Sequence, residues 1–168
     1  MSTFAVIDFE TATAAPNSAC AVGIINYHQG IIIDEYYTLI KPPKNEYLWQ
    51  NTRMHGISEK NTRNALSFLE LYETIKSRLY HRVVVAHNES FDRNVMLHTM
   101  EHYAIDYYDL ELPEKWECTV KLYRNKGYLR CNLKSLSQHF QIPLVHHDAL
   151  SDAKACGQLF LNHLMNLS

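Results

Sequence analysis

The sequence has little of what marks several classes of protein. Only 5 of its 168 residues are glycine and 5 are proline, while 46% are hydrophobic and 20% charged, which excludes a low-complexity or disordered chain. The longest mainly apolar run, residues 19–25, is far shorter than the ~18 residues of a membrane helix. Acidic residues at positions 8 and 10 stand where a signal peptide would have its apolar stretch, so no export signal is expected. We therefore expect one cytoplasmic domain, residues 1–168.

Paired cysteines and an excess of positive charge are also missing. The four cysteines form no Cys-x-x-Cys pair, so we expect reduced, mostly buried thiols and neither a thiolate zinc site nor a dithiol redox motif. The 16 basic residues do not outnumber the 18 acidic ones, although nucleic-acid binders are usually basic. One segment, residues 121–134, differs because it has five basic residues and no acid: Lys121, Arg124, Lys126, Arg130 and Lys134.

The spacing of apolar residues predicts an α/β domain. Predicted strands are residues 3–9, 20–27, 31–40 and 83–86, with a weaker one at 116–120; predicted helices are residues 65–80, 90–103, 133–140 and 148–165, with Ser90 as an N-cap. His28-Gln29-Gly30 predicts a hairpin turn between the second and third strands. A leading hairpin followed by alternating strands and helices predicts a mixed sheet with helices on its faces.

Two carboxylates stand near the end of the first predicted strand. Asp8 and Glu10 are two residues apart, so their side chains share one face of the strand, roughly 6.5–7 Å apart. At that distance they repel each other unless a cation lies between them. An exposed acidic strand end is the alternative interpretation.

A third carboxylate lies in an apolar helix face. On the last predicted helix, Asp152 shares a stripe with Ala149, Ala153 and Cys156, and burial of a carboxylate costs several kcal/mol unless it is paired or bound to a metal. A salt bridge or backbone bonds at the helix start are the alternative. The small alanines predict a close approach of this helix to the sheet.

Two further candidates have simpler alternatives. Asp92 falls in the first turn of a predicted helix, where the helix dipole by itself favours an acid, yet a buried strand leads into this turn and ligands bind at such strand ends. His147 precedes Asp152 by five residues and can reach the same site, or it is a surface histidine. For its neighbour His146 we expect neither a zinc site nor a catalytic role, since adjacent side chains rarely point the same way.

Together these residues suit phosphodiester hydrolysis with two metal ions. Carboxylate oxygens favour Mg²⁺ or Mn²⁺ over zinc. In such sites one ion generates the attacking hydroxide, and the other stabilises the leaving oxygen.

Three motifs in order resemble the DEDD superfamily of 3′→5′ exonucleases, in its histidine-containing branch, the group of the epsilon subunit of DNA polymerase III, oligoribonuclease and ribonuclease T. They are residues 4–11 (Phe-Ala-Val-Ile-Asp-Phe-Glu-Thr), 84–92 (Val-Val-Ala-His-Asn-Glu-Ser-Phe-Asp) and 147–153 (His-Asp-Ala-Leu-Ser-Asp-Ala). Residues 54–58 are also similar to the family's His-Gly-Ile-Thr segment. The resemblance implies a ribonuclease-H-like fold, a five-stranded mixed sheet flanked by helices.

The resemblance also implies roles for the residues. Asp8, Glu10 and Asp152 would hold one Mg²⁺ or Mn²⁺ ion, Asp8 and Asp92 would hold a second, and His147 would be the general base. Implied substrate contacts are Thr11, Ala12 (through its backbone amide, on the terminal 3′-hydroxyl), His55, Asn88 and Phe91. Here Ala12-Thr13 departs from the Thr-Gly that often follows Glu-Thr in the family.

The expected function is hydrolysis of single-stranded DNA or RNA from 3′ ends, with release of nucleoside 5′-monophosphates. Lys121, Arg124 and Lys126, interleaved with tyrosines, would bind the strand, or they form a solvated surface. A nucleic-acid-binding or polymerase-accessory module without turnover is the main alternative, and an enzyme for short oligoribonucleotides is another. The choice of DNA or RNA, a polymerase or repair partner and the oligomeric state are left open.

Overall fold

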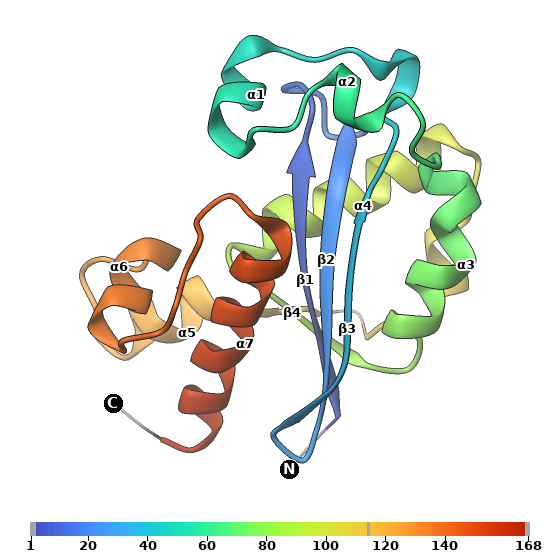
Figure 1. Cartoon of the computed structure of the whole chain (residues 1–168). Coiled ribbons are helices and arrows are strands. Elements are labelled where there is room, and N and C mark those ends of the chain that lie inside the picture. The colour runs from blue at the N-terminus through green and yellow to red at the C-terminus, as the bar shows by residue number, and fades with distance from the viewer. Residues whose placement is uncertain (1–2, 114, 167–168) are drawn as a thin grey trace.

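Three antiparallel strands lead the chain in the computed structural model, which describes residues 3–113 and 115–166 (Figure 1). They are β1 (Phe4–Thr11), β2 (Ala19–His28) and β3 (Ile31–Leu39). Gln29 and Gly30 connect β2 to β3 with φ values of 51° and 82°, the two positive values of a type I′ hairpin turn. The predicted hairpin is confirmed.

Two parallel strands complete the sheet on the other side of β1. β4 (Val83–Ala86) pairs with β1, β5 (Glu117–Cys118) pairs with β4, and the order is β3-β2-β1-β4-β5. This is the mixed five-stranded sheet that the sequence predicts. The fifth strand is shorter than predicted because a helix begins at Thr119.

The helices are α1 (Trp49–His55), α2 (Glu59–Thr62), α3 (Phe68–Leu79), α4 (Glu89–His102), α5 (Thr119–Asn125), α6 (Leu133–His139) and α7 (Ala149–Leu164), with 3₁₀ turns η1 (Pro43–Asn45) and η2 (Tyr107–Leu110). The four predicted helices correspond to α3, α4, α6 and α7. Helices α1, α2 and α5, each of one or two turns, were not predicted from the sequence. The prediction of Ser90 as an N-cap is wrong: Asn88, at a left-handed φ of 66°, precedes the first helical residue, and Ser90 lies inside the first turn.

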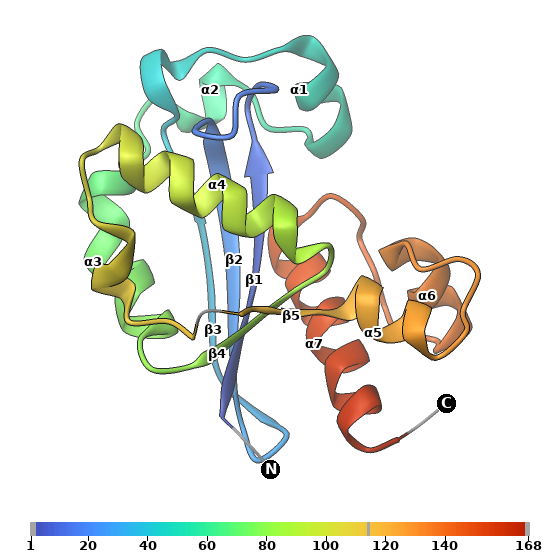
Figure 2. The same ribbon diagram turned by 180° about the vertical axis from the view of Figure 1, so that it is seen from behind.

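Helices cover both faces of the sheet. Helices α3 and α4 lie on one face, while α7, with α5 and α6 beside it, lies on the other (Figures 1 and 2). Side chains of β1 alternate between them: Ala5, Ile7 and Phe9 pack in the cluster that includes α3 and α4, and Phe4 and Val6 pack against α7. The same alternation directs the next two even-numbered side chains of β1, those of Asp8 and Glu10, toward α7.

The first turn of α7 lies very close to β2. Gly23 pairs with Asp8 across the two strands, and a Cβ atom at Gly23 would overlap the backbone of Ala149. Ala149 and Ala153 are fully buried at this contact, so the predicted close approach is confirmed. In the described part of the chain, no helix has the length and apolar character needed to cross a membrane.

Candidate active site

Asp8, Glu10 and Asp152 meet at the carboxyl end of β1. A carboxylate oxygen from each lies within 4.8 Å of one from each of the others. Glu10 and Asp152 are only 8% and 4% exposed, so the exposed strand end considered for Glu10 is wrong. The strand alternation and the first turn of α7 together bring the three side chains to one place.

Asp92 reaches the same strand end from the opposite side of the sheet. It lies in the first turn of α4 and is 1% exposed. Its Oδ1 accepts a hydrogen bond of 2.8 Å from the backbone N–H of Phe9, the residue between Asp8 and Glu10. Asp92 therefore not only lies at the start of a helix but also bonds directly to β1.

Burial raises the pKa of all four carboxylates, and mutual repulsion adds to this effect at Asp8, Glu10 and Asp92. Burial, followed by repulsion from Asp92 and Asp152, raises the pKa of Asp8 well above its usual range. Burial is also the largest cause that raises the pKa of Glu10 and that of Asp92 to about 8, and it raises the pKa of Asp152. Such a cluster holds protons unless cations replace them.

The donor set fits a hard divalent cation. Asp8, Glu10 and Asp152 offer only oxygen ligands, as Mg²⁺ and Mn²⁺ prefer. The Oδ1 atom of Asp152 is buried and has no hydrogen-bond partner within the described residues, which is costly for a carboxylate without a cation. The second group of close potential ligands, His146, His147 and Asp152, shares Asp152 with the first.

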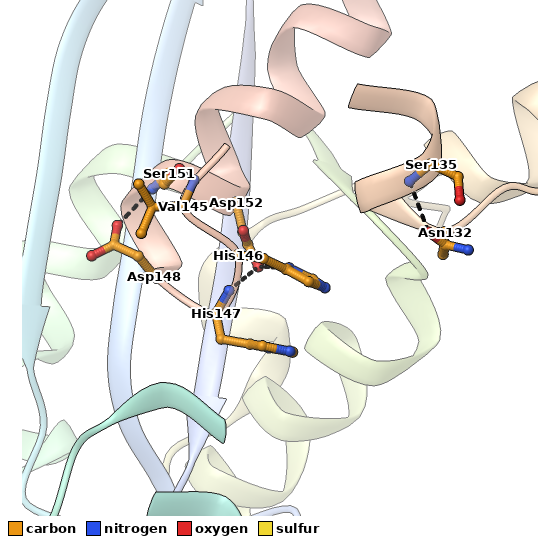
Figure 3. A network of polar contacts seen from close by, with 8 residues as sticks. All are labelled: Asn132, Ser135, Val145, His146, His147, Asp148, Ser151 and Asp152. Atoms are coloured by element: carbon orange, nitrogen blue, oxygen red, sulfur yellow. Dashed lines mark hydrogen bonds and ion pairs between the residues drawn. The ribbon is translucent and has the colours of Figure 1, made fainter. Parts of the chain in front are cut away.

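The two adjacent histidines point the same way, contrary to the expectation from sequence. Their rings stack with centroids 3.9 Å apart and an angle of 17° between planes (Figure 3). The reason is the backbone: His147 has a left-handed φ of 67°, which turns its side chain to the side of His146.

Asp152 contacts both histidines through one oxygen. Its Oδ2 accepts a hydrogen bond of 3.1 Å from the backbone N–H of His147 and lies 3.0 Å from Nδ1 of His146 (Figure 3). His146 is therefore part of the site, which the sequence prediction missed. Burial, and then the neighbouring His146, lower the pKa of the His147 imidazole.

A cavity of about 460 Å³ opens beside the carboxylates. This volume is within the range of roughly 300–1,000 Å³ that ligand pockets occupy. The lining residues come from β1, the end of β4, α5, the start of α6 and the start of α7. They are Asp8, His87, Asn88, Val120, Arg124, Cys131, Asn132, Leu133, His146 and Asp152.

Of the expected substrate contacts, Asn88 lines this cavity, whereas Thr11, Ala12, His55 and Phe91 do not. The Nε2 atom of His55 lies 3.1 Å from the carbonyl oxygen of Thr11, and Phe91 is 45% exposed. The backbone amide of Ala12 donates to the carbonyl of Ser18 at 2.8 Å, and Ala12 is completely buried. The expected contact of this amide with a 3′-hydroxyl is therefore wrong, because the turn after β1 already uses the N–H of Ala12.

The basic segment divides in the folded chain. Arg124 lines the cavity with Asp8. The ammonium of Lys121 lies 2.7 Å from Oε1 of the buried Glu89, and that of Lys126 lies 5.6 Å from the centroid of the Tyr123 ring, beside a different hollow. Of the three basic residues predicted to bind substrate, the structure thus brings Arg124 to the carboxylates.

Sequence reasoning also missed His87 and Asn132. Val83 and Val85 of β4 face α7 or the cluster beside it, and alternation carries His87 to the same side, next to the cavity. Burial lowers the pKa of His87 to about 4, partly offset by the backbone of Cys131, so the ring is neutral at pH 7. The position of His87 directly after a buried strand is the signal that could have identified it.

Comparison with known proteins agrees with this geometry. The model of the RNase T family, described as exonuclease, matches residues 5–160. A PolC-type DNA polymerase III from Thermotoga petrophila is 31% identical over 166 residues, which is 95% of this chain and 12% of that protein. The chain thus spans about an eighth of that relative's length.

Solved structures share the fold. E. coli Exonuclease I in complex with a dT13 oligonucleotide superposes with a TM-score of 0.83 at 18% identity, over 99% of this chain and 41% of that one. The nuclease domain of 3′hExo, a DEDDh family member bound to rAMP, has a TM-score of 0.81 at 15% identity, over 98% and 92% of the two chains. Both likenesses support the ribonuclease-H-like architecture.

Proposed function

Since this chain belongs to the RNase T exonuclease family, we propose that it hydrolyses phosphodiester bonds at single-stranded 3′ ends of DNA or RNA and releases nucleoside 5′-monophosphates. The observation that carries the proposal is the meeting of Asp8, Glu10 and Asp152 in a mostly buried cluster, with Asp92 bonded to the same strand. Structural or binding roles alone do not require four carboxylates with raised pKa values.

Two divalent cations are the proposed cofactors. Asp8, Glu10 and Asp152 would hold one, and Asp92, with Asp8, would hold the other. When bound, such ions supply an activated water and stabilise negative charge on the leaving oxygen. The buried carboxylates of this chain determine where the cations would bind. The β1 strand keeps Asp8 and Glu10 at a constant spacing.

His147 is the proposed general base. Its pKa is lowered, so the imidazole is mostly unprotonated at neutral pH and can accept a proton from the attacking water. Its backbone N–H donates a hydrogen bond to Oδ2 of Asp152, which fixes the position of the histidine relative to the carboxylate. Thr11, His55 and Phe91 would surround the terminal nucleotide, and Asn88 and Arg124 would face the remaining strand.

The substrate class is also part of the proposal. One structural relative was solved with a dT13 oligonucleotide and another with rAMP, so both DNA and RNA ends are to be tested. Similarity to PolC-type polymerases supports an association with a polymerase, in which mispaired 3′ ends would be the substrate. A primer with a terminal mismatch should then be shortened faster than the matched primer.

The direct test uses DNA and RNA oligomers labelled at the 5′ or the 3′ end, each incubated with Mg²⁺, Mn²⁺ or EDTA. We expect a ladder from 5′-labelled strands, immediate release of labelled mononucleotide from 3′-labelled strands, and no product in EDTA. A circular single strand should remain intact. Cleavage of the circle would contradict an exonuclease, and binding of every end without any turnover would favour the accessory-module alternative.

A further inference from the structure

The cavity beside the carboxylates has two walls of opposite chemistry. Asp8 and Asp152 form the acidic wall, while Arg124 of α5 and Asn132, directly before α6, belong to the other side. A ligand of about one nucleotide would contact both walls, since the whole cavity measures about 460 Å³. The acidic wall is already assigned to cations, but nothing in the proposed function explains the opposite wall.

Arg124 supplies positive charge to this wall. Within the described part of the chain it makes no ion pair, unlike Lys121, whose ammonium is paired with Glu89. An arginine presents several N–H donors in one plane and suits two oxygens of a phosphate.

Asn132 and His87 add neutral donors. Oδ1 of Asn132 accepts the backbone N–H of Ser135 at 2.8 Å, which fixes the side chain and leaves its amide N–H groups as donors (Figure 3). Nδ1 of His87 lies 2.8 Å from the hydroxyl of Thr119, and that hydroxyl lies 3.6 Å from the thiol of Cys156.

The other ring nitrogen of His87 is buried next to the cavity. Nε2 makes no hydrogen bond of ordinary geometry within the described residues, although the backbone of Cys131 lies near enough to offset part of the lowering of the His87 pKa. In the tautomer with the proton on Nε2, an anionic ligand in the cavity would accept that proton.

The direction of the strand identifies the ligand. In 3′→5′ hydrolysis the terminal nucleotide lies on one side of the scissile phosphate, and the penultimate nucleotide with the rest of the strand lies on the other. Thr11 and His55, the proposed contacts of the terminal nucleotide, lie outside the cavity lining. The penultimate nucleoside therefore enters the cavity, where Val120 and Leu133 offer apolar surface.

We propose that Arg124, Asn132 and His87 form a subsite for the second phosphodiester from the 3′ end, the linkage next to the scissile one. The inference rests on the proposed exonuclease function and adds a requirement on the substrate: the enzyme reads a negative charge one linkage upstream of the bond it breaks. Short substrates without that linkage are cleaved less efficiently than longer ones.

The test is an oligomer in which only the second linkage from the 3′ end is a methylphosphonate, which has no negative charge. For removal of the first nucleotide, wild-type kcat/KM should fall about tenfold or more relative to the unmodified oligomer, mainly through KM, because a charge-assisted contact is lost. In Arg124→Gln the unmodified oligomer should be cleaved about as poorly, and the methylphosphonate should cost far less than tenfold more, since only the neutral donors of Asn132 and His87 remain. Arg124→Lys, which keeps the charge, should restore part of the difference.

Arg130→Gln is the matched control. Arg130 belongs to the same basic segment and is exposed but does not line the cavity, so this variant should keep the full wild-type preference for the charged linkage. If the methylphosphonate still costs tenfold in Arg124→Gln, or if Arg130→Gln loses the preference equally, the subsite assignment is wrong.

Failure of the exonuclease proposal would be visible separately. If no oligomer is hydrolysed with Mg²⁺ or Mn²⁺, fluorescence anisotropy of the same labelled oligomers measures affinity in place of turnover. A tenfold weaker affinity for the methylphosphonate in wild type, absent in Arg124→Gln, would support the subsite while the catalytic proposal fails. Equal affinities for both oligomers in wild type would overturn the subsite.

Discussion

The interface between β1 and α7 has two halves of opposite character. In the first half, Phe4 of β1 stacks on Tyr27 with ring centroids 4.6 Å apart, and it meets Phe160 of α7 edge-on at 4.9 Å. In the second half, the same face of the same strand presents Asp8 and Glu10 to Asp152. The backbone geometry is continuous, and only the side chains change.

The aromatic half stabilises the fold, whereas the carboxylate half serves the proposed activity at a cost in stability. Burial of the aromatic half is favourable, at roughly 25 cal/mol for each Å² of apolar surface. Burial of the carboxylate half is unfavourable without cations, as the raised pKa values of Glu10 and Asp92 indicate. The aromatic half thus holds a rigid strand and helix in place, so that repelling carboxylates stay together.

The largest effect should come from removing one carboxylate of the charged half. Asp8→Ala should reduce turnover more than ~10³-fold, because this residue is assigned to both cations. In EDTA the variant should melt higher than wild type by a few degrees, since repulsion in the cluster is relieved. Turnover is measured with a 5′-labelled oligomer, and melting by scanning fluorimetry.

Glu101→Ala is the control for that variant, since Glu101 is exposed on α4. It should change neither turnover nor melting. An Asp8→Ala protein that unfolds would show instead that this half of the interface stabilises the fold.

The two stacked histidines should differ in the size of their effects. His147→Ala should lose about 10²–10⁴-fold in kcat, the usual contribution of a general base, while Mg²⁺ binding persists. The wild-type rate should rise with pH as the imidazole loses its proton, at a pH below the ordinary histidine range because the pKa is lowered. This rise should be missing in the variant.

His146→Ala should cost less, because it removes a contact to Asp152 and leaves the proposed base in place. Steady-state kinetics from pH 5 to 9 compare the two variants. A larger loss of kcat in His146→Ala, together with loss of the pH-dependent rise, would assign the base to His146.

A substitution in the aromatic half should lower the stability of the protein and leave its activity unchanged. Phe160→Ala should lower the free energy of unfolding by roughly 3–5 kcal/mol, through lost burial and a cavity next to Phe4. Activity per folded molecule should stay near that of wild type. Urea unfolding measures the loss, and Leu164→Ala on the same helix, where the side chain is 42% exposed, should cost far less. A cost as small as that of Leu164→Ala would mean that the aromatic half does not stabilise the interface.

The smallest effect is a dependence of stability on pH in the absence of metal. Glu10 and Asp92 have folded-state pKa values near 8, above the values of ~4 in an unfolded chain. The folded state therefore binds more protons, and its stability falls as the pH rises toward 8. The lowered pKa of His87 makes stability rise with pH, but only below pH ~6.5. Between pH 6.5 and 8 His87 therefore does not oppose the effect of the carboxylates on stability.

In that window the melting temperature in EDTA should fall by roughly 3–6 °C, which corresponds to a loss of one to two kcal/mol. Mg²⁺ should reverse the fall, because it binds the ionised carboxylates of the folded state only. Asp8→Ala should show a weaker dependence. A melting temperature that rises with pH in EDTA would contradict the raised pKa values.

Much of the fold and the carboxylate set could be predicted from the sequence, because local patterns carry that information. Short apolar runs rich in β-branched residues identified β1 to β4, and the apolar stripe of α7 revealed Asp152 as an anomaly. The Asp8–Glu10 spacing places both on one face of any strand. These conclusions need only the geometry of one strand or one helix.

Contacts between distant segments were decided by the tertiary structure. The left-handed φ of His147 turns its ring to the side of His146, His146 contacts Asp152, and the turn after β1 occupies the amide of Ala12. Lys121 pairs with Glu89, whereas Arg124 lines the cavity. A sequence fixes which chemical groups are present and which face of an element they share. Which groups meet and which are already bonded depends on how elements far apart in the chain pack together.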